Sequence, residues 1–371
     1  MNYEQLKLES EKYKDTMSNM ERMIAYAKGE EVDRIPFTFS GSDTLAPLYG
    51  YTMEEYRNSF EVQCQMVKNL DKDFGVLGAG VSLGLKGIGE AVGTKLVYPK
   101  NDIEYVQEHI LTTYDDLDNM EVVNPYTNHI LKPMMDKIRK YKEYFGEDLP
   151  IGTGVAGPLS TAIAIRKADL VMKDMIKNKD QLHKLLDYSV KCSLAWVEAV
   201  NKEFGITGVG LADPASSTTL ISKKQFKEFT TPHMIDLVKG IEKITGKTPG
   251  LHICGKTKDI WMELCDIGFK SFSVDNCEDL EELKLAVGDR MSISGNVAPV
   301  DVLKNGTIDD VIESVRQCLL KGSDNPMGYT LAAGCQVPIS VPRENLEAYI
   351  FAAKKYGRGA QKGKLCKGLF D

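Results

Sequence analysis

The sequence has little of several features that mark whole classes of protein. Its 46 Lys and Arg residues are outnumbered by 53 Asp and Glu residues, which gives a formal net charge of −7. A basic face for nucleic acid is therefore not expected. Eight cysteines in 371 residues are too few for a disulfide-dense secreted domain, and no stretch approaches the roughly 18 consecutive apolar residues that a membrane span requires. These absences predict a cytoplasmic protein with neither a nucleic-acid partner nor a membrane partner.

Targeting and nucleotide-binding motifs are also missing. The first residues, Met1 to Tyr26, carry mixed charges and lack the apolar core of a signal peptide. No Gly-x-Gly-x-x-Gly opens a helix after a strand, and there is no Walker lysine loop. The 32 glycines lie scattered between apolar runs instead of gathering in a linker. We therefore expect one continuous fold without a dinucleotide or nucleotide site.

What the chain does contain is a recurring pattern of a short apolar run, a small-residue break and an amphipathic helical stretch. Eight alternations of this kind are typical of a (β/α)8 (TIM) barrel, with a doubly wound sheet as the second choice. The eight predicted strands cover residues 34–39, 74–79, 149–155, 206–211, 249–253, 269–274, 291–294 and 328–333. The main predicted helices cover residues 53–70, 182–203, 223–244, 308–321 and 343–356.

Two segments are expected to decorate the barrel. Residues 1–33 are predicted to form a helical lead-in of one or two helices, stopped near Gly29, and residues 34–371 to form the barrel domain. Residues 94–113 are predicted to be a strand excursion after the second barrel strand. The predicted architecture is thus a single decorated α/β barrel.

The strongest chemical signal is the segment Gly250-Leu-His-Ile-Cys-Gly255. His252 and Cys254 are two residues apart at the end of a predicted strand, so their side chains should point to the same side. Strand ends on the carboxyl face of a barrel carry its active site, and Cys335 ends the last predicted strand in the same way. One imidazole and two thiolates suit zinc, and three protein ligands leave a coordination position open. We therefore predict a catalytic zinc held by His252, Cys254 and Cys335.

The remaining cysteines and an ordinary packing role provide the alternatives. His252 could be a hydrogen-bonded barrel histidine, with the two cysteines as small buried apolar residues. Cys277 follows another predicted strand end and is a competing ligand. Cys64, Cys192, Cys265, Cys318 and Cys366 lie in helical patterns or in the Lys-rich C-terminal tail, and we predict structural roles for them.

Polar and small residues end other predicted strands. Asp213 and Asp275 are predicted to be catalytic, either in proton transfer or in orienting a metal-bound histidine. The alternative for both is a helix N-cap. Gly157, Gly295 and Asn296 lie in small-residue loops that would let a bulky cofactor approach the backbone, although tight turns alone would also explain the glycines.

These motifs together resemble the uroporphyrinogen decarboxylase superfamily. The resemblance covers nearly the whole chain and is carried by Arg34-Ile-Pro, Ala212-Asp-Pro, Leu220-Ile-Ser, Ile293-Ser-Gly-Asn, the His-x-Cys pair and the late Gly334-Cys. The His-x-Cys pair and the distant cysteine resemble its zinc-dependent methyltransferase branch, whose members exchange methyl groups with a separate corrinoid (cobalamin) protein. Residues 37–43 lack the arginines with which the decarboxylases grip a porphyrin.

The resemblance implies a zinc cofactor, a cobalamin carried by a partner protein, and a small-molecule methyl donor or acceptor. We predict demethylation of an aryl methyl ether, with transfer of the methyl group to Co(I), because the charged lead-in resembles anaerobic O-demethylase components. A methylcobalamin:thiol methyltransferase of the coenzyme M type is the alternative, and a decarboxylase is the third reading.

Two further expectations complete the analysis. A barrel with a closed, purely structural zinc site that docks a corrinoid protein is the non-enzymatic alternative, and it would need a fourth protein ligand such as Cys277. A homodimer is the expected oligomeric state, since two-fold dimers are the commonest assemblies.

Overall fold

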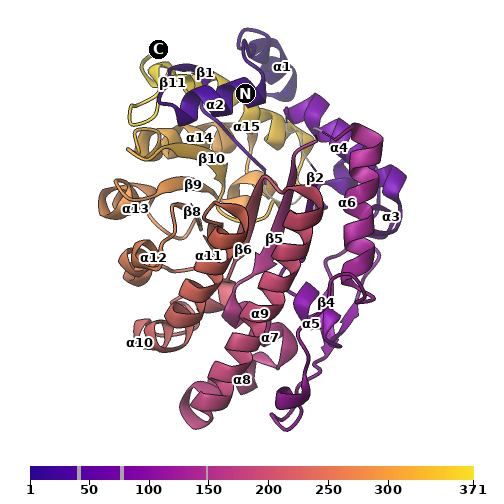
Figure 1. Ribbon diagram of the computed structural model, residues 1–371. Coiled ribbons are helices and arrows are strands. Elements are labelled where there is room, and N and C mark those ends of the chain that lie inside the picture. Colours follow the sequence, from indigo (N-terminus) through magenta and orange to yellow (C-terminus); the bar gives the residue numbers. More distant parts are fainter. Residues whose placement is uncertain (40–42, 76–78, 148) are drawn as a thin grey trace. The chain divides into compact units, whose positions relative to one another are not determined.

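The computed structural model describes residues 1–39, 43–75, 79–147 and 149–371. It confirms the α/β class, because strands and helices alternate along the chain (Figure 1). The chain forms two compact units, the first comprising Met1–Leu77, Lys100–Asp102 and Ser271–Asp371, the second Gly78–Pro99 and Ile103–Lys270. Among the described helices, none combines the length and the apolar character needed to cross a membrane.

The second unit is built on four parallel strands in the order β2-β5-β6-β7. The strands are β2 (Ala79–Ser82), β5 (Ile151–Ala156), β6 (Gly208–Ala212) and β7 (Gly250–Ile253). The helices of this unit are α5 (Gly87–Ala91), η2 (Leu117–Asn119), α6 (Leu131–Phe145), α7 (Pro158–Ile165), α8 (Ala168–Lys177), α9 (Lys179–Phe204), η3 (Pro214–Ser216), α10 (Lys223–Gln225), η4 (Phe226–Thr230), α11 (Thr231–Thr245), η5 (Lys258–Ile260) and α12 (Trp261–Ile267).

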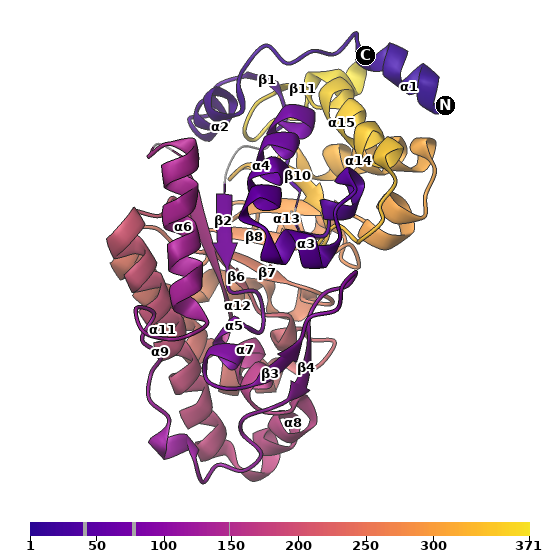
Figure 2. The same ribbon diagram turned by 90° about the vertical axis from the view of Figure 1, so that its right-hand side faces the viewer.

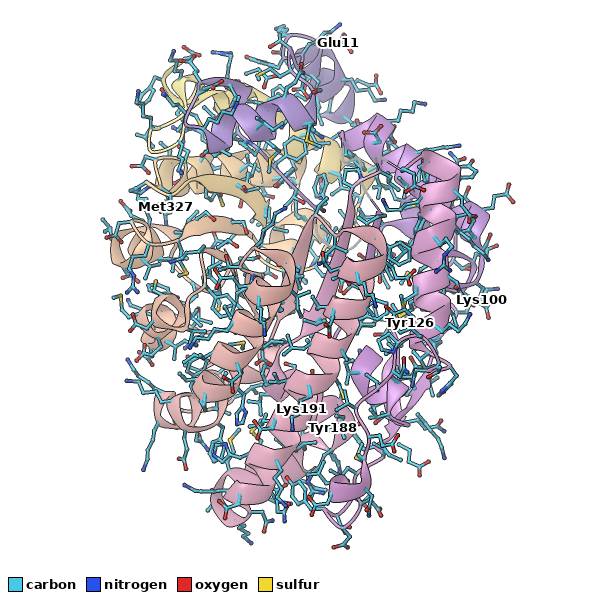
Figure 3. The ribbon with its side chains drawn as sticks, viewed as in Figure 1. Glu11, Lys100, Tyr126, Tyr188, Lys191 and Met327 are labelled. Carbon is cyan, nitrogen blue, oxygen red and sulfur yellow. The ribbon has the colours of Figure 1, made fainter. Side chains whose placement is uncertain are left out.

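The long helix α9 is anchored to this sheet and to the loop before α6. Trp196 is fully buried, and its indole N–H donates to Thr153 Oγ1 of β5 at 2.9 Å. Tyr188, also on α9 (Figure 3), donates its hydroxyl to the Glu121 carbonyl at 2.9 Å. Each aromatic ring buries apolar surface while its polar tip finds a partner, the usual arrangement for buried Trp and Tyr.

The predicted strand excursion is a two-stranded antiparallel hairpin. It pairs β3 (Lys95–Val97) with β4 (Tyr105–Glu108), and both strands lie near α5 and α7 in Figure 2. The excursion predicted for residues 94–113 is therefore confirmed.

The first unit contains three parallel strands in the order β8-β9-β10 and a separate antiparallel pair of β1 and β11. The strands are β1 (Val32–Arg34), β8 (Ser271–Val274), β9 (Ser292–Val297), β10 (Tyr329–Ala333) and β11 (Arg358–Ala360). The helices are α1 (Tyr3–Ser10), α2 (Asn19–Ala27), η1 (Ala46–Tyr49), α3 (Met53–Asn58), α4 (Phe60–Phe74), α13 (Leu280–Val287), η6 (Pro299–Lys304), α14 (Ile308–Gly322), α15 (Arg343–Tyr356) and η7 (Lys367–Phe370).

The first predicted barrel strand, residues 34–39, is reduced to a single parallel bridge between Phe37 and Leu331 of β10. The Thr38 N–H donates to the Leu331 carbonyl, and the Leu331 N–H donates to the Pro36 carbonyl. Pro36 has no N–H of its own, so the ladder cannot extend through it. The small-residue break expected after this strand, residues 40–42, lies outside the described residues.

The second predicted strand, residues 74–79, was placed too early. Phe74 is the last residue of α4, and Gly75 caps that helix in the left-handed conformation at φ 63°. The strand itself is Ala79–Ser82. The apolar run around Phe74 belongs to the buried face of an amphipathic helix, which a short run of apolar residues cannot distinguish from a strand.

The lead-in contains two helices, α1 and α2, and Gly29 follows α2 at φ 81° as expected. It is tied to β1 by ion pairs of two buried arginines: Arg22 with Asp33 at 2.6 Å, and Arg34 with the partly exposed Asp15 at 2.9 Å. The guanidinium of Arg22 helps to hold the pKa of Asp33 down at about 2, against the effect of burial. The boundary between residues 33 and 34 stays a prediction.

Candidate metal centre

The end of β7 presents two potential metal ligands side by side. Leu251 and Ile253 are buried in the core, whereas His252 and Cys254 are only half-buried. The imidazole Nε2 of His252 lies 3.0 Å from the Sγ of Cys254. The period-two argument is confirmed, since alternate side chains of this segment separate into a core face and an accessible face.

Cys335, the third predicted ligand, follows β10 by two residues and is also half-buried. The choice of Cys335 over Cys277 as the third ligand stays a prediction.

The donor set fits a zinc ion. Tetrahedral zinc with ordinary Zn–N and Zn–S bond lengths separates an imidazole nitrogen and a thiolate sulfur by roughly 3.5 Å. The His252–Cys254 distance of 3.0 Å needs only a small side-chain adjustment to reach that value. Two sulfurs and one nitrogen also match the preference of zinc for borderline-soft ligands. The identity of the metal and of its ligands stays a prediction.

Asp213 follows β6 and is completely buried. Its Oδ1 accepts the backbone N–H of Ser160 in α7 at 2.8 Å, and its Oδ2 accepts the hydroxyl of Ser216 at 2.7 Å. Burial raises the pKa of this carboxyl, while the hydrogen bonds oppose the rise. Its own backbone N–H donates to the carbonyl of His252 at 3.0 Å. A catalytic role for Asp213 stays a prediction; the structure shows a carboxylate whose two oxygens both accept hydrogen bonds from the protein.

Gly157, predicted to bind a cofactor, instead lies directly against this carboxylate. A Cβ at position 157 would stand 2.4 Å from both the Cβ and the Cγ of Asp213. No side chain tolerates such a distance, so glycine is needed here for close packing. Cofactor contact by Gly157 stays a prediction, and its packing against Asp213 explains the glycine without a ligand.

Hydroxyl residues that the sequence analysis passed over surround the turn after Cys254. The Lys256 carbonyl accepts the hydroxyls of Ser217 and Thr218 at 3.0 and 2.8 Å and the Thr218 N–H at 2.8 Å. The Lys256 N–H donates to Thr219 Oγ1 at 3.0 Å. A run of four hydroxyl residues, 216–219, just after a strand-end aspartate was the available signal.

Asp275 follows β8 and stabilises the next turn through its side chain. Its Oδ1 accepts the Cys277 N–H at 2.9 Å, the pattern of an Asx-turn. Cys277 is exposed, and burial of its sulfur together with the negative charge of Asp275 raises the pKa of its thiol to about 11. A thiol with so high a pKa gives little thiolate at neutral pH. The catalytic role predicted for Asp275 stays a prediction.

Gly295 and Asn296 lie on β9, beside the same turn. The Asn296 Nδ2 donates to the carbonyls of Asp275 and Glu278 at 3.2 and 2.9 Å, and its Oδ1 accepts a weak bond from Cys318 Sγ at 3.7 Å. Gly295 has φ 142°, and a Cβ there would stand 2.9 Å from the Val274 carbonyl oxygen. The backbone geometry explains both residues locally, and their predicted cofactor contacts stay predictions.

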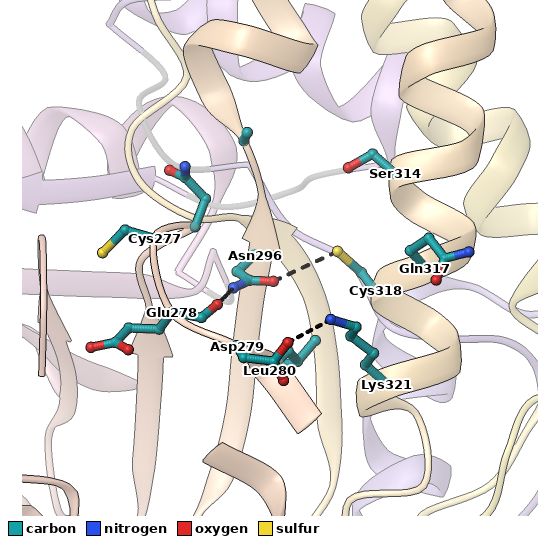
Figure 4. Close-up of a pocket in the computed structure, with 11 residues that line it drawn as sticks. Cys277, Glu278, Asp279, Leu280, Asn296, Ser314, Gln317, Cys318 and Lys321 are labelled. Atoms are coloured by element: carbon teal, nitrogen blue, oxygen red, sulfur yellow. Dashed lines mark hydrogen bonds and ion pairs between the residues drawn. The ribbon is translucent and has the colours of Figure 1, made fainter. Parts of the chain in front are cut away.

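Asn296 also lines an open, polar cavity of about 400 Å³ between the end of β9 and α14 (Figure 4). The ion pair of Lys321 and Asp279, 2.6 Å apart, closes one side of it. Asn276, another lining residue, lies against the chain next to Cys335, because a Cβ on Gly334 would stand 2.5 Å from the Asn276 nitrogen. No group that could hold a metal lines this cavity among the described residues.

Comparisons with known proteins agree on one family. The family model described as uroporphyrinogen decarboxylase (URO-D) matches residues 18–356. The methylcobamide:CoM methyltransferase MtaA of Methanosarcina barkeri is 27% identical over 90% of this chain and 97% of its own, and MtbA of Methanosarcina mazei is 26% identical over 91% and 97%. A solved methyltransferase from Methanosarcina mazei superposes with a TM-score of 0.77 at 25% identity, covering 92% of this chain and 99% of its own.

Proposed function

Because the chain belongs to the uroporphyrinogen decarboxylase family, and its similar relatives include methylcobamide:CoM methyltransferases, we propose that it is a zinc-dependent, corrinoid-linked methyltransferase. The methyl group would pass between a corrinoid protein and a thiol. The observation that carries the proposal is the pair of His252 and Cys254 at 3.0 Å, with Cys335 as the predicted third ligand.

The ligand set explains why a thiol suits this site. His252, Cys254 and Cys335 would supply three protein ligands, which leaves room for one exogenous ligand on a tetrahedral ion. Zinc bound there would lower the pKa of a coordinated thiol, so that its thiolate form predominates at neutral pH. His252, Cys254 and Cys335 are each half-buried, so the proposed centre would be accessible to a small molecule.

The proposed reaction balances without an added oxidant or reductant. The thiol proton leaves to solvent, and the thiolate sulfur forms a bond to the methyl carbon. The cobalt–carbon bond breaks with its electron pair on cobalt, so methyl-Co(III) becomes Co(I) and the thiol becomes a methyl thioether. The corrinoid is carried by a partner protein and is part of the substrate in this scheme.

Methyl transfer to a thiol is better supported than demethylation of an aryl methyl ether. The relatives named as methylcobamide:CoM methyltransferases support transfer to a thiol, whereas none of them names an ether. The ether reaction stays a prediction that the same assay tests. Decarboxylation is the weakest of the three, because residues 37–43 lack arginine.

The experiment combines metal analysis with two spectroscopic assays. Purified protein is expected to contain one zinc per chain. Methylcobalamin is then offered with a panel of thiols, and Co(I)-cobalamin is offered separately with aryl methyl ethers. We expect loss of the methyl-Co(III) spectrum only when thiol, protein and zinc are all present.

Two alternative outcomes would redirect the assignment. Consumption of Co(I) on adding an ether, with no reaction of thiols, would replace the proposed function by O-demethylation. Stoichiometric zinc without any methyl transfer, together with a fourth protein ligand in X-ray absorption, would favour a structural zinc site.

A further inference from the structure

We propose that residues 213–219, here called the clamp segment, form a positioning device that fixes Cys254 and His252 for metal binding, with the Asp213 carboxylate as its anchor. This inference rests on the proposed zinc site. It assigns to Asp213 a role through the protein framework instead of direct contact with substrate, and it adds Ser217, Thr218 and Thr219 to the functional residues.

The clamp segment holds the chain on the N-terminal side of Cys254. Ala212 pairs with His252 in the parallel ladder of β6 and β7, and the next residue extends this ladder by one bond. That bond runs from the Asp213 N–H to the His252 carbonyl at 3.0 Å. The backbone of the ligand residue His252 is therefore fixed at the point where its strand ends.

The same segment holds the chain on the C-terminal side of Cys254. Lys256 is bound at both of its backbone groups: its carbonyl accepts three hydrogen bonds from Ser217 and Thr218, and its N–H donates to Thr219. Cys254 thus lies midway between two anchored residues. Bonds on both sides restrict the backbone torsions that set the direction of its Sγ.

Close packing supports the clamp at the turn itself. Gly255 has φ 80°, and a Cβ at this position would stand 2.8 Å from both Ser217 Oγ and Thr219 Oγ1. The hydroxyls therefore lie directly against the backbone next to Cys254. Such a turn favours glycine both for its positive φ and for lack of space.

The Asp213 carboxylate ties the clamp segment to the rest of the second unit. Through Ser160 it reaches the first turn of α7, and through Ser216 it reaches the Thr230 hydroxyl, which lies 3.1 Å from Ser216 Oγ. The Ser160 hydroxyl in turn accepts the Ala215 N–H at 3.1 Å. All five residues are at least nine-tenths buried, so water cannot replace these bonds without rearrangement.

The affinity of a protein for a metal is sensitive to residues that position the metal ligands. Groups that orient metal ligands without touching the metal commonly change the affinity by 10- to 100-fold when they are removed. The Asp213→Ala variant leaves the Ser160 N–H and the Ser216 hydroxyl without their acceptor and loosens the end of β6. We expect its zinc affinity to fall by about 10- to 100-fold.

The Asp213→Asn variant tests whether zinc binding depends on the hydrogen bonds of the residue 213 side chain or on its negative charge. The amide oxygen can still accept the Ser160 N–H, and the amide N–H can donate to Ser216, whose hydroxyl both donates and accepts. We expect this variant to keep the wild-type zinc affinity. It should also keep the wild-type thiolate-to-metal charge-transfer spectrum when Co(II) replaces zinc, whereas in Asp213→Ala those bands should shift or weaken.

Asp174→Ala is the matched control. Asp174 is equally buried in the same unit and accepts bonds from Arg166 and Tyr114 at 2.8 Å, but it lies on α8 and makes none of the clamp contacts. Its removal should lower the free energy of unfolding without changing the zinc affinity. Competition with a chromophoric chelator gives the affinity, and urea unfolding of the metal-free proteins gives the stability.

A second pair of variants covers the case in which Asp213→Ala does not fold. Thr219→Val removes the hydroxyl that accepts the Lys256 N–H, and Thr207→Val removes the hydroxyl of another exposed residue, which donates to the Ile151 carbonyl before β6. The first should weaken zinc binding by several-fold, since water can partly replace the bond. The second should leave zinc binding unchanged.

The outcomes separate this inference from the proposed function. Wild-type protein that binds no zinc refutes the proposed function, on which the inference rests. Zinc-binding wild type with an equally tight, folded Asp213→Ala or Thr219→Val variant refutes the clamp alone. Equal losses of affinity in Asp213→Ala and Asp174→Ala, or in Asp213→Ala and Asp213→Asn, would also refute it.

Discussion

Two regions at strand ends of this protein carry the same residue types and differ in what surrounds them. After β6 and β7, an aspartate is buried and a cysteine faces a histidine at 3.0 Å. After β8, Asp275 is only half-buried and Cys277 is exposed, with a thiol pKa of about 11. An aspartate and a cysteine at a strand end are therefore not enough to define a site. The residues around them decide whether the pair can take part in a metal site.

The sharpest test of this comparison is the metal content of two cysteine variants. Cys254→Ala removes one of three ligands of the proposed centre, and we expect complete loss of stoichiometric zinc with the fold retained. Cys277→Ala should keep one zinc per chain, because Cys277 is not one of the three proposed ligands. Metal analysis after gel filtration measures both, and zinc lost from Cys277→Ala but kept by Cys254→Ala would invert the assignment.

A smaller effect is expected from the packing around the buried carboxylate. In Gly157→Ala the new methyl group would stand 2.4 Å from the Cβ of Asp213, so α7 or the strand end must shift. Overpacking of this kind costs about 3 kcal/mol of unfolding free energy. Urea denaturation measures this loss of unfolding free energy. An alanine variant as stable as wild type would show that the backbone around Asp213 can shift at little cost.

The corresponding change at the other strand end should cost less. Asn296→Ala removes two hydrogen bonds, to the carbonyls of Asp275 and Glu278, which lie where solvent has partial access. We expect a loss of about 1.5 kcal/mol in unfolding free energy, with zinc content unchanged. If zinc is lost instead, the turn after β8 supports the metal centre more directly than its contacts indicate.

Asp33 extends the comparison to a carboxylate held by a cation. Its folded pKa, about 2, lies below the ordinary value of 3.8, so its contribution to stability is present above about pH 4 and is lost as the pH falls towards 2. Asp33→Asn should therefore lower the unfolding free energy by about 1 kcal/mol at neutral pH. The difference from wild type should shrink as urea titrations move from pH 5 to pH 3; a constant difference would assign the effect to hydrogen bonding alone.

Local patterns in the sequence were sufficient for the order of elements and for the central pair of ligands. The alternation of strands and helices predicted the α/β barrel class, and the period of two in β7 placed His252 and Cys254 on one side. Both inferences depend on neighbours within a few residues, where backbone geometry leaves few choices. The same local information misplaced the strand near Phe74, because short apolar runs fit a helix equally well.

Tertiary structure decided the roles of the residues around that pair. Asp213 and Asp275 are alike in sequence position, yet one is completely buried between α7 and η3 and the other folds an exposed turn. The hydroxyls of residues 217–219 acquire their role only because the turn after β7 lies against them. Burial and hydrogen-bond partners come from segments distant along the chain, so no local pattern could supply them.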